Sequence, residues 1–458
     1  MVTTTDRADA RAPSGILRGA QRGTTLGIVI VVTLIAFEAM AVATAMPFAV
    51  RDLGGLSYYS WAFTAFLVAS VVGIVVSGDL SDRIGAARPL LAGLGVFTVG
   101  LVVAGVAPSM ALFVAGRAVQ GFGAGVVIVA NYVVIAQVYD EALRPKVFAA
   151  LSAAWVLPSV LGPPISGLLT QHLSWRLVFL GLPPFIVVGT LLLAPALRRL
   201  PPRPAGRSGA RLRALFAVGA AGGVVLLQVA GQELRWISLP LAVAGLALLA
   251  ASLQRLLPSG TPRLRHGLPA VVAFRGLLAG SFFGADAFLP LTLTSVHGFP
   301  ASLAGVPLVT AALGWSAGSW WQGRRGLQHR HKLVRSGFAA VAVAVLGLAV
   351  VALPGVSGWL AAPVWVLGGL GMGLAMSTFS VLALQFAPQG EQGFASSALQ
   401  ISDVLCSSLG VGLAGVLVLA VHRAGGSMSS GIVAVNILLA SVAVVGAFAS
   451  GRARAPRG

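Results

Sequence analysis

Four charged side chains lie deep inside long apolar stretches of this sequence, where a charge is unfavourable unless it is paired, neutralised or in contact with water. Three are acids, Glu38, Asp286 and Asp403, and the fourth is Arg117. A carboxyl group that is ionised when it faces water and neutral when it is enclosed takes up and releases a proton. These residue types in these surroundings predict proton exchange in a cavity inside the membrane.

Each of these acids also has an alternative, purely structural interpretation. Glu38 could form a fixed ion pair with Arg117, because the rise per residue places the two at similar depths, although such a pair could also be made and broken between states. Asp286 and Asp403 could be hydrogen-bonded packing residues, and Asp403 falls near the expected midplane, where transporter sites are usual. Arg275 lies early in its apolar segment and is expected to extend to the membrane surface.

The surrounding composition is that of a membrane protein. Of the 458 residues, 57% are hydrophobic and only 9% are charged, whereas a soluble protein has about 25% charged residues. The apolar segments are mostly about 20 residues long, which is the length that a helix needs to cross a bilayer. We expect fourteen of them, at 25–48, 60–78, 89–107, 110–136, 147–169, 177–197, 213–231, 236–254, 268–294, 301–321, 336–353, 358–385, 394–420 and 430–450. This predicts an all-α polytopic membrane protein.

The basic residues predict the orientation of these segments. Almost all of the 31 lysines and arginines fall in the tails and in loops on one side of the predicted membrane. The loops of the other side hold only Arg51, Arg176, Arg235 and Arg423. Because loops rich in lysine and arginine remain in the cytoplasm, we expect both termini there, in a multi-pass protein of the plasma membrane. Topology then explains the net charge of +19, and no nucleic-acid partner is expected.

The two halves of the chain look like copies of one unit. Adding 248 to Gly121, Gly123 and Gly125 gives Gly369, Gly371 and Gly373, and the same shift takes Glu38 to Asp286. The shift also relates Gln137 to Gln385, Ser159 to Ser407, Gly162 to Gly410 and Gly167 to Gly415. Duplicated halves are typical of secondary transporters. An offset this long is explained by two helices inserted between two six-helix halves.

This organisation gives five expected regions. They are a cytoplasmic tail over 1–24, a six-helix bundle over 25–198, linkers with two extra helices over 199–266, a second six-helix bundle over 267–450, and a cytoplasmic tail over 451–458.

Several short motifs resemble the major facilitator superfamily, and in particular its fourteen-helix drug:proton antiporter branch. Gly78-Asp79-Leu80-Ser81-Asp82-Arg83-Ile84-Gly85 resembles the signature loop between helices two and three. The helix-four motif is matched by Arg117, Gln120, Gly121 and Gly123, the helix-five motif by Gly162, Pro163 and Gly167, and the start of helix six by Ser174–Phe179.

The chain departs from the family pattern at several positions. Ala86 and Ala87 replace basic residues, Pro158 and Ser166 replace glycines of the helix-five motif, and Glu38 replaces an aspartate. The last exchange keeps an acid, whereas the helix-five changes weaken the inference of export.

The resemblance implies a major facilitator fold, with two six-helix bundles that rock about a central cavity. It implies that Gly78, Asp82, Arg83 and Gly85 form a conformational latch that holds the outward-facing state. It also implies that Gly162, Pro163 and Gly167 form a bend in helix five that closes a leak path, although an ordinary kink is the alternative.

These observations favour a proton-coupled secondary transporter that exports hydrophobic or cationic small molecules, in the manner of multidrug efflux, by alternating access. The alternative is proton-coupled or facilitated uptake of a small metabolite on the same fold. The expected partners are a small-molecule substrate, protons and the lipid bilayer, with the protein as a monomer and the proton gradient in place of a cofactor. With Arg117 as the only deep base, the acids carry excess negative charge, and Glu38→Gln is expected to abolish proton-driven transport at an unchanged protein level.

An enzyme is not expected, because the sequence shows neither a Ser/His/Asp set nor a metal-ligand cluster, and Cys406 is its only cysteine.

Overall fold

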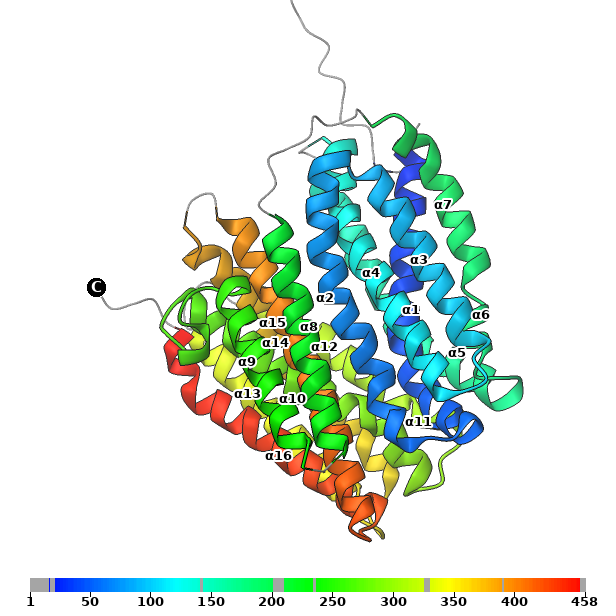
Figure 1. Ribbon diagram of the computed structural model, residues 1–458, viewed down its shortest axis with the longest axis vertical. Helices are drawn as coiled ribbons and strands as arrows, with labels where there is room; N and C mark the ends of the chain where they lie inside the picture. The colour runs from blue at the N-terminus through cyan, green and yellow to red at the C-terminus, as the bar shows by residue number, and fades with distance from the viewer. Residues whose placement is uncertain are drawn as a thin grey trace, which may run out of the picture.

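The computed structural model describes residues 16, 21–140, 143–200, 210–233, 236–324, 330–388 and 391–453 (Figure 1). Within these ranges every regular element is a helix, and fourteen spans are long and apolar enough to cross a membrane. The predicted all-α polytopic fold and the predicted number of spans are therefore confirmed.

The spans follow one another in two groups of six, with a pair between them. The first group comprises α1 (Gln21–Leu53), α2 (Tyr59–Ile84), α3 (Ala87–Gly105), α4 (Met110–Val138), α5 (Arg144–His172), and the pair α6 (Leu177–Leu180) and α7 (Pro183–Arg198). The inserted spans are α8 (Ala210–Glu233) and α9 (Ser238–Leu256). The second group comprises α10 (Leu268–Ser295), the pair α11 (Ala301–Ala304) and α12 (Val306–Arg324), α13 (Arg330–Val351), α14 (Ala361–Phe386), α15 (Gln392–Arg423) and α16 (Met428–Ala449).

Two spans that the sequence predicts as continuous are broken near their first turn. The helix expected at 177–197 is divided at Gly181 and Leu182, directly before Pro183. The helix expected at 301–321 is divided at Gly305, two residues before Pro307. Proline donates no N–H, and its ring clashes with the preceding turn, so a new helix begins at or beside it.

Glycines of α4 and α14 make the same contacts in the two halves. Gly121 and Gly125 lie against the backbone of α2, whereas Gly123, on the other side of α4, lies against α3. The corresponding glycines of α14 repeat this pattern, with Gly369 and Gly373 against α12 and Gly371 against α13. A Cβ atom at any of these positions would collide with the neighbouring helix, so the 248-residue repeat reflects equivalent close packing.

The two bundles are joined at one end of the molecule. We call the end where α1 begins and α16 finishes the terminal end, and the opposite end the far end. Between described residues, the direct hydrogen bonds from one bundle to the other lie in the far half: Arg51 Nη2 to Thr294 O (3.3 Å), Tyr59 Oη to Ala287 O (2.7 Å) and Ser302 Oγ to Gln171 Oε1 (2.7 Å). In Figure 1 the first bundle extends to the top, where α1 begins, while α16 finishes at the left.

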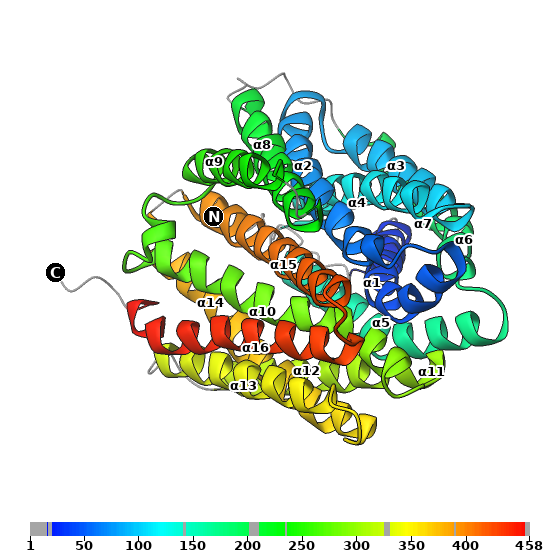
Figure 2. The same ribbon diagram turned by 60° about the horizontal axis from the view of Figure 1, so that its bottom comes forward.

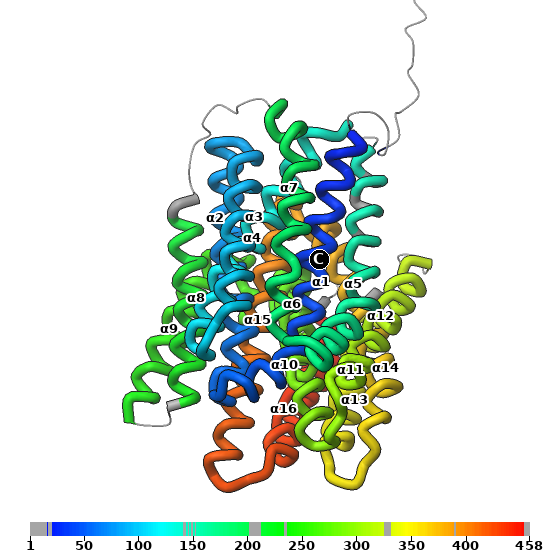
Figure 3. Tube along the Cα trace, turned by 90° about the vertical axis from the view of Figure 1, so that its right-hand side faces the viewer, coloured from blue at the N-terminus to red at the C-terminus, as the bar shows by residue number. Residues whose placement is uncertain are grey.

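The inserted pair lies on one side of this junction. α8 packs against both α2 of the first bundle and α15 of the second, and α9 covers the outer side of α8 (Figures 2 and 3). Gly223 and Gly245 bring the backbones of α8 and α9 close together, because a Cβ on Gly223 would lie 2.8 Å from the Gly245 carbonyl oxygen.

Candidate functional site

Glu38 of α1 and Arg117 of α4 form an ion pair in the interior of the first bundle. The guanidinium Nη1 donates to Glu38 Oε1 and to Gln120 Oε1 (2.7 Å), and Nε donates to the Ala62 carbonyl oxygen (2.9 Å). Glu38 is 0% exposed and Arg117 is 3% exposed, so almost no solvent reaches either charge. The predicted proximity of these two residues is correct, and Glu38 is neutralised by a base in this conformation.

The environment of this pair is incompletely hydrogen-bonded. Glu38 Oε2 and Gln120 Nε2 are buried and have no hydrogen-bond partner among the residues that the structure describes. The guanidinium also lies over the ring of Phe66, 4.4 Å from its centroid, a cation–π contact that stabilises a desolvated positive charge. The second carboxylate oxygen therefore lacks a hydrogen bond in this conformation, which is unfavourable for a buried polar atom.

Asp286 of α10 has a different kind of partner. The indole Nε1 of Trp365, from α14, donates to Asp286 Oδ1 at 2.8 Å. Asp286 is partly buried, and no described residue forms a salt bridge with it. The ring of Trp365 is fully buried and stacks on Phe282, one turn before Asp286, with the ring centroids 4.6 Å apart. This stack fixes the indole so that its N–H points at the carboxylate.

The Asp286–Trp365 pair is the repeat equivalent of the Glu38–Arg117 pair. The 248-residue shift relates Glu38 to Asp286 and also Arg117 to Trp365. In both halves the acid of the first helix is bonded to the residue of the fourth helix. The chemistry of the two pairs differs, because a guanidinium neutralises the carboxylate whereas an indole only donates a hydrogen bond.

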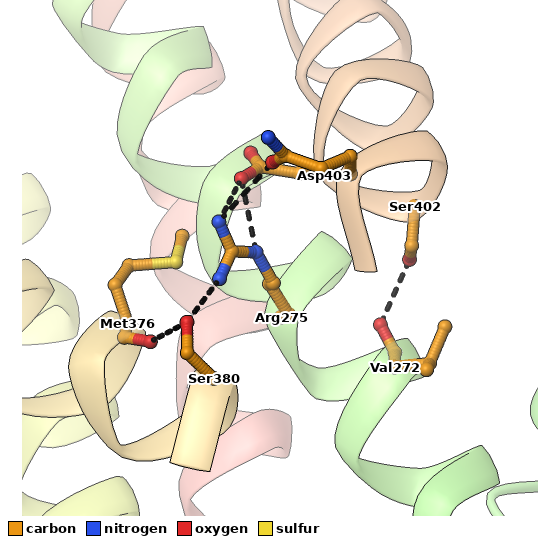
Figure 4. A network of polar contacts seen from close by, with 7 residues as sticks. Val272, Arg275, Met376, Ser380, Ser402 and Asp403 are labelled. Carbon is orange, nitrogen blue, oxygen red and sulfur yellow. Dashed lines mark hydrogen bonds and ion pairs between the residues drawn. The ribbon is translucent and has the colours of Figure 1, made fainter. Parts of the chain in front are cut away.

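Asp403 of α15 is paired with Arg275 of α10 (Figure 4). Arg275 donates to Asp403 Oδ2 from Nη2 (2.9 Å) and from Nε (3.1 Å), and to Ser380 Oγ of α14 from Nη1 (3.1 Å). The side chains of Arg275 and Asp403 are 14% and 17% exposed. The expectation that Arg275 extends to the membrane surface is therefore wrong, because an acid on the neighbouring helix holds its guanidinium inside the bundle.

The three acids thus lie in three separate polar groups. With the second deep base included, Glu38 and Asp403 are each paired with an arginine, and Asp286 is the acid without a cation among the described residues. From the sequence, we expect an excess of negative charge over the three acids together. In the structure Asp286 is the acid of the three that carries this uncompensated charge.

The residues of the expected latch lie at the terminal end of α2. Arg83 Nε donates to Asp79 Oδ1 at 2.8 Å, one turn earlier on the same helix, and Asp82 is exposed. A Cβ at Gly78 or at Gly85 would meet no atom within 4 Å, and Gly85 ends α2 with a φ of +79°. Among the described residues, none packs against Gly78 or Gly85 in the present conformation, in which the bundles are joined at the opposite end.

The helix-five motif lies where the bundles touch. A Cβ at Gly167 would lie 2.6 Å from Ser302 Cα at the start of α11, and one at Gly305 would lie 2.9 Å from Pro163 Cβ. Gly162, one turn before Ser166, faces α1, and Ser166 Oγ donates to the Ala41 carbonyl oxygen at 2.7 Å. α5 runs without interruption through Pro158, Pro163 and Pro164. The motif therefore provides a close contact between bundles at the far end.

Two of these contacts are not predicted from the sequence, namely that of Trp365 with Asp286 and that of Arg275 with Asp403. Trp365 could have been found, because the same offset that relates the two acids relates it to Arg117. The pairing of Arg275 with Asp403 leaves no such signal, since 128 positions separate them. Within the described residues no group of three or more histidines, cysteines or acids is placed to hold a metal ion.

Comparison with known proteins identifies the family of this architecture. A model of the Major Facilitator Superfamily matches residues 28–411. An MFS-type transporter of Mycobacterium tuberculosis, described as uncharacterized, is 30% identical over 463 residues, covering 93% of this chain and 65% of the relative. The chain therefore spans about two thirds of the length of that relative.

Two other relatives carry names that refer to drugs. A probable multidrug-efflux transporter of the same species is 26% identical, with 93% of this chain and 94% of the relative aligned. A multidrug transporter protein of Bacillus subtilis is 27% identical, with 85% of this chain and 74% of the relative aligned.

Solved structures share the fold at low sequence identity. The POT family transporter PepTSo superimposes with a TM-score of 0.69 at 14% identity, over 93% of this chain and 98% of that chain. A bacterial homologue of the human lysosomal transporter Spinster gives a TM-score of 0.65 at 14% identity, over 96% of this chain and 100% of that chain.

Proposed function

Because this chain belongs to the Major Facilitator Superfamily, a family of transporters rather than enzymes, we propose that it is a proton-coupled exporter of hydrophobic or cationic small molecules. We place it in the fourteen-helix drug:proton antiporter branch of that family. The fourteen spans and the multidrug transporters among its relatives support this assignment. In this proposal the protein spans the plasma membrane, and its terminal end lies on the cytoplasmic side.

The observation that carries the proposal is the state of Asp286. Its carboxylate lies inside a membrane-spanning helix, its Oδ1 is bonded to the Trp365 indole, and no described cation neutralises it. An uncompensated carboxylate in hydrocarbon is unfavourable, so the group gains from binding a proton or a cationic substrate whenever water reaches it. This is the property that an exchange site requires.

Glu38 and Asp403 take part differently, since each must first leave an arginine before it can be protonated. Exchange at these positions requires a conformational change that separates the ion pair. In the cycle we propose, the acids bind protons from outside in the outward-facing state. They release these protons to the cytoplasm in the inward-facing state, while substrate moves outward. Interactions that differ between two states are what allow one flux to drive the other.

The present conformation corresponds to the inward-facing half of that cycle. The bundles are joined at the far end through Tyr59, Gly167 and Ser302, and Asp82 of the latch is exposed at the terminal end. Closing the terminal end would bring the second bundle over Gly78 and Gly85, where no described residue lies within 4 Å of an added Cβ.

The proposal is tested in proteoliposomes that contain the purified protein, with an acidic lumen and the pH dye pyranine inside. Ethidium, tetraphenylphosphonium and the neutral dye Nile red serve as probes. We expect at least one probe to accumulate as protons leave the lumen, Asp286→Asn to abolish both fluxes, and Asp286→Glu to retain them.

Asp52→Asn is the matched control, because Asp52 is exposed and paired with Arg176 at the far end. Full proton-driven accumulation by Asp286→Asn would contradict the role of Asp286. Accumulation that requires the opposite gradient would instead indicate proton-coupled uptake.

A further inference from the structure

The inserted pair α8 and α9 contributes no charged residue to the polar groups described above, yet two glutamines of α8 are placed between the bundles at the far end. Gln228 is 3% exposed, and Gln232 lies one turn further along the same face. One buried and one partly buried amide in a membrane-spanning helix are unfavourable unless their polar atoms are hydrogen-bonded, which points to a role beyond filling space.

Both glutamines bind the first bundle through their side chains. Gln228 Nε2 donates to Ser60 Oγ at 3.0 Å, and Gln232 Nε2 donates to the Ser57 carbonyl oxygen at 2.9 Å. Gln232 Oε1 also accepts a hydrogen bond from Trp61 Nε1 at 2.8 Å. The end of α8 is thus bonded at three points to the beginning of α2 and the turn before it.

The contact of α8 with the second bundle is of another kind. A Cβ at Gly231 would lie 2.6 Å from Val416 Cγ1, and one at Gly412 would lie 3.2 Å from Gln228 Oε1, so small residues allow α15 to approach closely. The guanidinium of Arg423 donates to the backbone carbonyl oxygen of Gln232. Among the described residues, the interface apart from that bond is made of packing contacts, and Gln228 Oε1 has no hydrogen-bond partner among them.

We propose that α8 and α9 move as part of the first bundle and that α8 closes the far end by seating on α15, from which it separates when that end opens. The proposal rests on the alternating access proposed above. Its basis is the unequal bonding of α8 within the described residues. Separation from α15 breaks packing contacts and one hydrogen bond, whereas separation from α2 breaks three side-chain hydrogen bonds. Gln228 and Gln232 are the positioning residues that fix α8 to α2.

Cysteine cross-linking tests which partner α8 leaves. In a Cys406→Ser background, Gly231→Cys and Val416→Cys are combined to join α8 to α15. A third substitution, Thr64→Cys, reports opening of the far end, because Thr64 is 0% exposed and lies beside Gly412 at this junction. We expect the oxidised pair to abolish labelling of this reporter thiol by a membrane-impermeant maleimide, and a reductant to restore it.

The matched control joins α8 to α9 through Gly219→Cys and Ser252→Cys, since a Cβ on Gly219 would lie 2.5 Å from Ser252 Oγ. This cross-link should leave labelling of the reporter thiol unchanged. A second test, without a cross-link, replaces both glutamines by leucine, and we expect labelling of the same thiol to become about tenfold faster because α8 is no longer held in place.

Unchanged labelling after the α8–α15 cross-link would overturn the proposal, since α8 would then remain on α15 when the far end opens. Unchanged or slower labelling of the double leucine variant would overturn the positioning role of the glutamines. Both readouts need neither substrate nor a proton gradient, so a failure of proton-coupled export would leave this test intact.

Discussion

Removing Arg117 alone should destabilise the protein far more than removing Arg117 and Glu38 together. Arg117→Met leaves the Glu38 carboxylate inside the first bundle, where it is 0% exposed, without the base that neutralises it. Losing one partner of a buried ion pair costs about 3–5 kcal/mol, because the other charge remains desolvated and unpaired. In Arg117→Met/Glu38→Gln that charge is gone.

The double variant should recover much of this loss but not all of it. Arg117 also donates to the Ala62 carbonyl oxygen and lies over the Phe66 ring, and methionine replaces neither interaction. A lost hydrogen bond to a buried acceptor costs about 1–3 kcal/mol. We therefore expect the double variant to remain about 1–3 kcal/mol less stable than the native protein, with a favourable coupling of about 2 kcal/mol or more between the two sites.

The measurement is a double-mutant cycle on thermal unfolding of the purified protein in one detergent, with proton-driven transport in proteoliposomes measured in parallel. Additive effects of the two single substitutions on stability would contradict the assignment of a buried ion pair. Transport separates the structural from the coupling role of Glu38, because a folded double variant that still couples proton and substrate flux would show that Glu38 carries no proton.

Three further predictions concern packing, the Asp286 site and orientation. Gly369→Ala should lower the stability by about 1–3 kcal/mol, because the added Cβ would collide with the Ala311 carbonyl oxygen, although alanine itself favours a helix. Gly95→Ala is the control, since Gly95 faces open space and its replacement should be neutral or stabilising. Thermal unfolding compares the two variants. Trp365→Phe should cost about 1.5–3 kcal/mol through the lost hydrogen bond to Asp286, and clearly less in an Asp286→Asn background, which a second double-mutant cycle would show. In a Cys406→Ser background, a membrane-impermeant maleimide should label Gly78→Cys only in inverted cell-membrane vesicles and Ala424→Cys only in right-side-out vesicles, and the reverse pattern would place the termini outside the cell.

The sequence predicts the arrangement of the spans well because that arrangement depends on local properties. Apolar length and the placement of basic loops identify fourteen spans, and glycines that recur at a fixed offset identify helices that pack closely in both halves. The breaks before Pro183 and Pro307 follow from local chemistry as well, but an apolar segment with proline near its start does not show whether the helix bends or stops.

The partners of the buried charges are harder to predict, because they depend on the rotation of each helix about its axis. Asp403 and Arg275 form an ion pair because they lie on the faces of α15 and α10 that pack against each other. The sequence of either helix alone does not show which helix it packs against. Glu38 and Arg117 could be paired in advance only through their similar depth. The role of Trp365 is harder to predict because the residue type differs between the halves. Trp365 occupies the position equivalent to Arg117, but a tryptophan, unlike an arginine, is not expected to pair with an acid.

The difference between the two halves matters more for function than their likeness. Duplication places an acid of the first helix beside a residue of the fourth helix in each bundle, so the geometry of Glu38–Arg117 is repeated at Asp286–Trp365. Had both copies kept arginine, each carboxylate would be neutralised and neither would gain from binding a proton in this conformation. Replacing one guanidinium by an indole keeps the hydrogen bond and removes the positive charge, which leaves one acid free to bind a proton or a cation. The exchange site we propose therefore lies at Asp286, where the two halves keep the same arrangement of side chains but differ in the chemical type of the partner residue.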